Sequence, residues 1–171
     1  MSMNFNVYIN DIDDSKIEPW IKELNKLGMK CEIHPDFSFK SHSGFLPFKI
    51  NISENSHDLL LNKDYLTGFE YFIDDFNLDD HTNYKKQTFI QKVFGRPKQK
   101  LFLHSKEIDE KLMNKKFNIT FNFGVSDTFE LRIAYLASAC LSKITNGLCC
   151  DQNNNIWYEN HNVIEKALVE I

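Results

Sequence analysis

The side chains best suited to catalysis or metal binding are scattered along this sequence. Six histidines stand at positions 34, 42, 57, 81, 104 and 161, and four cysteines at positions 31, 140, 149 and 150. None of the histidines forms an HxH, HxxxH or HExxH pair, and the cysteines form no CxxC pair. Zinc sites use such spacings because they bring two ligands to the same side of a helix or turn. The sequence therefore predicts no metal site, and without a GxxxxGK[ST] loop it predicts no bound cofactor.

A nucleophile with an adjacent base occurs once, at His42-Ser43-Gly44. Neighbouring side chains on an extended segment point apart, and the GxSxG elbow of the serine hydrolases is absent, so this segment favours a turn. An enzyme with a dispersed active site stays an alternative, and its best-placed residues would be Cys31, His34, Asp36 and His42. The sequence as a whole favours binding without catalysis, and it predicts no catalytic residue.

Charge is strongly segregated along the chain. Residues 81–116 carry ten Lys or Arg against three acids, whereas residues 1–80 carry seven against fifteen. Two regions of opposite potential suit a charged macromolecular partner better than a small substrate. The overall pI is about 5.9 and no RNP, KH or helix-turn-helix signature is present, so nucleic acid is the less favoured partner.

Length and composition predict one folded domain, residues 1–171, with a basic, insertion-like segment at 81–116. Hydrophobic residues make up 42% of the chain and fifteen of them are Phe, which indicates a packed core. We expect a cytoplasmic protein, because the sequence shows neither a signal peptide nor an apolar run long enough for a membrane span. In that compartment the four cysteines are expected to be buried free thiols, with adjacent Cys149 and Cys150 pointing to opposite faces of a strand.

Alternating apolar residues predict strands, and helical spacing predicts helices between them. Strands are expected at 5–9, 45–52 and 117–123, and a hairpin is expected from 148–150 and 156–158. Two further short apolar runs stand at 29–33 and 68–73. A first helix would begin at a Ser15–Glu18 capping box, tolerate Pro19 in its first turn and end at Gly28. Further helices are expected at 84–94 and at 105–113, the second capped by Ser105.

The last third of the sequence gives the clearest pattern. Asp127 with Glu130 predicts the start of an Ala-rich, largely buried helix that runs through Ile144 and stops at Asn146-Gly147. Asn162 with Glu165 predicts a final helix. Strands and helices mix without βαβ alternation, so the predicted class is α+β: a mainly antiparallel sheet packed by an N-terminal and an Ala-rich C-terminal helix, followed by a hairpin and a final helix.

Three segments together resemble a known group of proteins. They are HSGFLPFKI at 42–50, TGFEYFIDDF at 67–76 and ELRIAYLASACLSKITNGLCCDQNNNIWY at 130–158. In this order they resemble small bacterial α+β proteins that include the immunity proteins of contact-dependent growth inhibition and related polymorphic toxin systems. The resemblance implies a cytoplasmic protein that binds and neutralises the C-terminal domain of one cognate toxin, often a nuclease, without catalysis. A non-catalytic regulatory protein with another protein partner is the alternative.

Electrostatics then suggests which surface would meet such a toxin. A nuclease presents a cationic substrate groove, and carboxylates on an inhibitor are steered into it. The predicted partner surface is therefore acidic and consists of Glu70, Asp74, Asp75, Asp79 and Asp80, with Phe76 and Tyr84 as apolar anchors. Lys85 and Lys86 mark the rival surface, which would suit an acidic toxin face. The oligomeric state is left open by the sequence.

Overall fold

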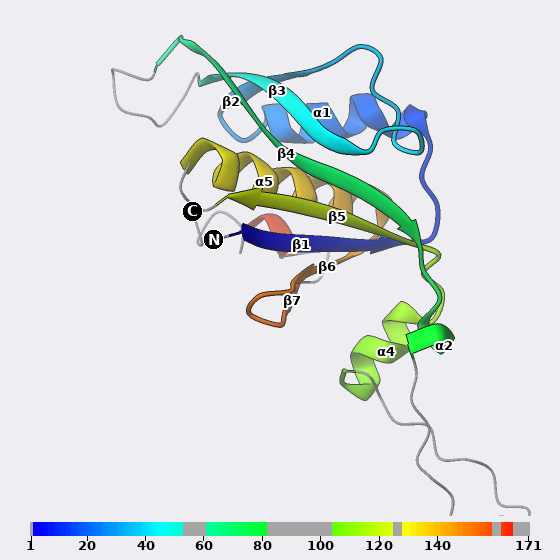
Figure 1. Ribbon diagram of the computed structural model, residues 1–171. Coiled ribbons are helices and arrows are strands. Elements are labelled where there is room, and N and C mark those ends of the chain that lie inside the picture. The colour runs from blue at the N-terminus through cyan, green and yellow to red at the C-terminus, as the bar shows by residue number, and fades with distance from the viewer. Residues whose placement is uncertain (1, 53–60, 82–103, 125–127, 159–161, 166–171) are drawn as a thin grey trace, which may run out of the picture.

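Seven strands form one antiparallel sheet at the centre of the molecule (Figure 1). The computed structural model describes residues 2–52, 61–81, 104–124, 128–158 and 162–165. Across the sheet the strands follow the order β2-β3-β4-β5-β1-β6-β7. Their bounds are β1 Ser2–Ile9, β2 Met29–Ile33, β3 Gly44–Ile52, β4 Asp64–Asp75, β5 Phe117–Gly124, β6 Leu148–Asp151 and β7 Ile156–Tyr158.

Two helices cover one face of this sheet, and two shorter helices lie at one end of it (Figure 1). The covering helices are α1, Ile17–Asn25, and α5, Thr128–Thr145. The short helices are α2, Leu78–His81, and α4, Lys106–Leu112. Residues 163–165 are also helical. The predicted α+β class, with its C-terminal hairpin and final helix, is confirmed, and no helix among the described residues is long and apolar enough to cross a membrane.

The core forms where the strands turn their apolar residues toward α1 and α5. On β5, Ile119, Phe121 and Phe123 are buried, while the residues between them face the opposite side of the sheet. Trp20 of α1 lies at the centre of an aromatic cluster, and its indole Nε1–H donates a hydrogen bond to the Ala137 carbonyl of α5 at 2.8 Å. This bond joins the two helices and satisfies the one polar group that the indole brings into the core.

Most predicted element ends are confirmed. Ser105 caps α4 by accepting a hydrogen bond from the Ile108 N–H at 3.2 Å. Asn146, in the left-handed region with φ of 51°, follows the last residue of α5. Cys149 belongs to the core under the helices, and Cys150 packs on the opposite side of the sheet, as their adjacency on a strand predicts.

The predicted start of the first helix is wrong in its capping residue. The chain enters α1 through a 3-10 turn, Asp14–Lys16, and Asp13 caps this turn by accepting from the Ser15 N–H at 2.8 Å. Ser15 does not cap the helix, because it lies inside this 3-10 turn and the N–H groups that need a cap are at the start of the turn. The predicted helix at 84–94 and the capping residue Asp127 lie outside the described residues.

Candidate protein-interaction surface

The two faces of the sheet differ in what covers them. We call the side packed by α1 and α5 the covered face, and the opposite side the open face. Strand alternation sends every second side chain of the central strands to the open face. Its residues on β3, β4, β5 and β1 are Phe45, Pro47, Lys49, Asn51, Asp64, Leu66, Gly68, Glu70, Phe72, Asp74, Asn118, Thr120, Asn122, Asn4, Asn6 and Tyr8.

An exposed apolar patch lies on β3 and β4, toward the β2 edge of this face. Leu66 is 85% exposed and Phe45 is 58% exposed, although both are large apolar side chains. Pro47, also exposed, is paired with Gly68 between them. Contiguous apolar groups exposed on an otherwise polar surface mark an interaction site more often than isolated ones do.

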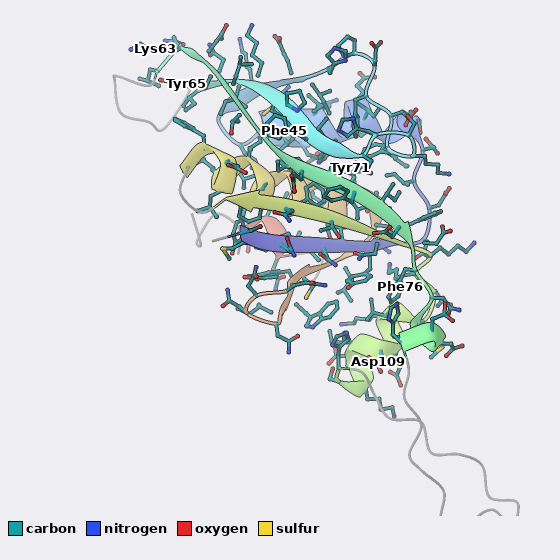
Figure 2. The ribbon with its side chains drawn as sticks, viewed as in Figure 1. Phe45, Lys63, Tyr65, Tyr71, Phe76 and Asp109 are labelled. Carbon is teal, nitrogen blue, oxygen red and sulfur yellow. The ribbon has the colours of Figure 1, made fainter. Side chains whose placement is uncertain are left out.

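Gly68 explains how Phe45 is held on this surface. A Cβ at position 68 would come within 2.7 Å of the Phe45 Cζ atom and within 2.3 Å of the Leu46 carbonyl oxygen. The ring therefore lies across the neighbouring strand, over the position that only glycine leaves empty. Figure 2 shows Phe45 on the sheet, well away from Phe76 at the end that carries α2. The aromatic ring thus lies against the backbone of β4 at Gly68.

Charges on the β2 side of the apolar patch neutralise one another. Lys49 lies 3.0 Å from the Asp64 carboxylate and 3.7 Å from that of Glu32. Asp64 raises the pKa of the Lys49 ammonium, while hydrogen bonds from Asn51 and then Lys49 lower the pKa of the Asp64 carboxyl. With Lys30, these residues line a shallow polar hollow of about 200 Å³. Two lysines and two acids leave this side without net charge.

On the other side of the patch the charge is negative. Glu70 lies directly opposite Phe45 in the β3–β4 register, and Asp74 follows on the same face of β4. Both are exposed, as are Asp75 at the strand end and Asp79 and Asp80 in α2. Within the described part of the chain, Glu70, Asp74, Asp75 and Asp80 form no ion pair. The five acids predicted from the sequence thus run along one strand and into the helix that follows it.

Phe76 packs within the molecule at the far end of the open face. Its ring lies 4.8 Å from that of Tyr8, edge to face, and stacks on the His81 ring at 5.6 Å. Leu78 of α2 and Leu112 of α4 join Tyr8 there in a small apolar cluster with Leu148 and Cys150. A half-buried ring in such a cluster fixes α2 and α4 against the sheet. Tyr84, Lys85 and Lys86 lie outside the described residues.

The residues proposed for an alternative, dispersed active site differ in their burial and in their neighbours. Burial raises the pKa of the Cys31 thiol to about 12, which leaves it protonated and poorly nucleophilic near neutral pH. His34 Nδ1 lies 3.9 Å from an Asp36 carboxylate oxygen, with both side chains largely exposed. The His42 ring packs 5.4 Å from Phe37 and 6.1 Å from Tyr71. In the described ranges, no three His, Cys, Asp or Glu side chains are grouped so that they could hold a metal ion.

Sequence reasoning missed the apolar patch, although the sequence contains a signal for it. The alternation that buries Phe48 and Ile50 places Phe45 and Pro47 on the opposite side of the same strand. Pairing with β4 then brings Leu66 to this side, next to Lys49. The strand expected at 45–52 contains this alternation, but the sequence does not show which of its two faces the helices cover.

Comparisons with protein-family models, with curated proteins and with solved structures found no match to this chain. A candidate function therefore has to be argued from the open face itself and from the resemblance of the three sequence segments.

Proposed function

We propose that this protein is an immunity protein that neutralises one cognate bacterial toxin domain by binding it in a one-to-one complex. The observation that carries the proposal is the open face, where Phe45 and Leu66 are exposed beside carboxylates that form no ion pair with a described residue. Apolar anchors beside acids are what binding to a cationic protein surface requires.

The size of the open face suits such a complex. Asn6 and Tyr8 of β1 are buried, so the accessible part of the open face lies on β3, β4 and β5. At about 4.8 Å between strands and 3.3 Å per residue, three strands of about nine residues cover on the order of 430 Å². Specific complexes bury roughly 800 Å² on each partner. The open face thus supplies about half of one side of an interface, and the acids of α2 extend it.

The sheet also suits the role because it is rigid. The open side chains of β4 and β5 project from strands whose other side packs in the core. Side chains held in place before binding lose less conformational entropy on association, and the saved free energy appears as affinity. Neutralisation would then follow from occlusion: the protein covers the substrate groove of the toxin and performs no chemistry on it.

The proposal places the protein in the cytoplasm, where a nuclease toxin meets its substrate. Reducing conditions there keep thiols unpaired. All four cysteines are free and buried, which is compatible with that compartment.

Coexpression tests the proposed function. The toxin fragment is the C-terminal region encoded by the gene immediately upstream, expressed with this protein, with an empty vector or with an unrelated toxin. We expect growth to be rescued only in the cognate pair, with copurification at one-to-one stoichiometry. If this protein rescues growth when it is present in far smaller molar amounts than the toxin, it acts by turnover, and this result would contradict occlusion. A harmless fragment that does not copurify would contradict the proposal.

A further inference from the structure

The pairing of Phe45 with Glu70 has the geometry of a binding site for a cationic side chain. The two residues are direct neighbours across β3 and β4 and point to the same open face. Side chains in such cross-strand positions have Cβ atoms about 5 Å apart. An aromatic ring and a carboxylate at this distance can both contact one guanidinium group, the ring through its face and the carboxylate through hydrogen bonds.

Among the described residues, no cation pairs with this carboxylate or lies over this ring. Phe45 is 58% exposed. The lysine on the same strand, Lys49, is held by Asp64 and Glu32 on the far side of the patch. Elsewhere the chain does place a cation over a half-buried ring: Lys40 Nζ lies 5.6 Å from the centre of the Phe117 ring. A cation from a partner could therefore occupy the position over Phe45 and beside Glu70.

We propose that Phe45, Gly68 and Glu70 form the centre of the toxin-binding surface and take an arginine side chain from a basic surface of the partner. This proposal rests on the proposed function for the identity of the partner. Gly68 keeps the ring lying over β4, the ring stacks on the guanidinium plane, and Glu70 accepts two of its hydrogen bonds. Arginine suits the pair better than lysine, because its planar group can stack and form a bidentate pair at once.

The surroundings of this site favour the same occupant. Pro47 is the next residue after Phe45 on the open face of β3, and its ring can contact the aliphatic stem of an arginine. Leu66 lies one pair further along, opposite Lys49. Toward α2 the next charged residue on the open face is Asp74, so the potential stays negative along the strand. Next to Glu70 in the other direction lies Asn122, an amide at the same level of β5. A basic protein surface is therefore the partner that these residues complement.

Binding measurements on four variants test the proposal with the cognate toxin fragment. Phe45→Leu keeps an apolar side chain but removes the aromatic face, and Glu70→Gln keeps the shape but removes the charge. We expect the Kd to rise about fivefold to thirtyfold for Phe45→Leu and at least tenfold for Glu70→Gln. Glu18→Gln on α1 and Met113→Leu after α4 are matched controls, because both residues are exposed, the first on a helix of the covered face and the second next to the short helix at the end of the sheet (Figure 1). Their Kd should stay within about twofold of the wild type.

A peptide titration separates this proposal from the proposed function. Octa-arginine and octa-lysine are titrated into the folded protein alone, and amide chemical shifts are recorded. The site predicts shifts that cluster at Phe45, Gly68 and Glu70, that are larger for octa-arginine and that disappear in Glu70→Gln. Shifts confined to Asp79 and Asp80, or no shifts at all, would overturn the site even if the toxin is neutralised. Shifts at the site without a neutralised toxin would leave the site standing and reject the immunity function.

Discussion

The large side chains are buried on the covered face of the sheet and partly exposed on its open face. On the covered face, Trp20 and Phe121 are completely buried, and even the buried Tyr71 hydroxyl donates to the Phe39 carbonyl at 3.0 Å. On the open face, Phe45 and Leu66 are exposed. The covered face holds the core on which stability depends, and our proposal assigns recognition to the open face. Substitutions should therefore separate the two properties.

The largest effect is expected from Trp20→Ala on the covered face. Removing the indole leaves a cavity and removes the hydrogen bond that the indole donates to the Ala137 carbonyl, so the free energy of unfolding should fall by about 3–5 kcal/mol. Urea denaturation measures this loss. Toxin affinity of the fraction that remains folded should be unchanged, and a large loss of affinity in that fraction would contradict the separation of the faces.

Gly68→Ala should have the next largest effect, because it disturbs the backbone that carries the patch. The new Cβ would lie 2.3 Å from the Leu46 carbonyl oxygen, which requires a backbone shift, and we expect a loss of about 1–3 kcal/mol. Gly124→Ala is the matched control: its nearest contact would be 3.4 Å from the Glu130 carboxylate. Thermal unfolding of both variants compares them, and equal losses would show that the close approach at Gly68 has no energetic role.

Alkaline pH should weaken the molecule through its buried thiols. Burial raises the pKa of Cys140 and Cys149 to about 12 from an ordinary value of 9.0. The raised pKa stabilises the folded state fully below pH 9, and this contribution is lost as the pH rises toward 12, because the unfolded chain releases its thiol protons first. Each thiol should account for about 1 kcal/mol between pH 9 and pH 10.

The measurement for the thiols is chemical unfolding at pH 8, 9 and 10 in the wild type and in Cys149→Ala. The variant should show a shallower decline than the wild type. A thiol reagent added at pH 8 should label all four cysteines only in denaturant. Rapid labelling of the native protein would contradict their burial.

The smallest effect on stability is expected from Leu66→Ser on the open face. A side chain that is 85% exposed contributes little to the core, so the free energy of unfolding should change by no more than about 0.5 kcal/mol. Toxin affinity should nevertheless fall, as measured by calorimetry. A loss of stability as large as that of Gly68→Ala would show that the patch supports the fold.

Local sequence patterns predicted the elements because local physics determines them. The alternation at 117–123 and the Asn146-Gly147 stop each depend on residues near one another in the chain, and β5 and α5 follow them. The strand order could not be predicted in this way. β1 lies between β5 and β6, and these pairings join residues more than a hundred positions apart.

The candidate site could be predicted only in part, because its charges are visible in the sequence and the contacts between its strands are not. Glu70 and Asp74 stand out in the sequence as charges, but their position beside Phe45 depends on the register between β3 and β4. Phe76 was predicted as an apolar anchor, and its packing against Tyr8 and His81 depends on where α2 meets the sheet. Exposure of an aromatic side chain is a property of the whole fold, so composition alone does not reveal it.

Oxidative footprinting of the complex tests the central claim most directly. Hydroxyl radicals modify exposed Phe, Leu, Met and Ile side chains, and the free protein exposes Phe45 and Leu66 on the open face but Met113 and Ile156 elsewhere. The account predicts that binding the toxin fragment slows oxidation at Phe45 and Leu66 and leaves the rates at Met113 and Ile156 unchanged. Unchanged rates at Phe45 and Leu66, with protection at Met113 or Ile156, would contradict it.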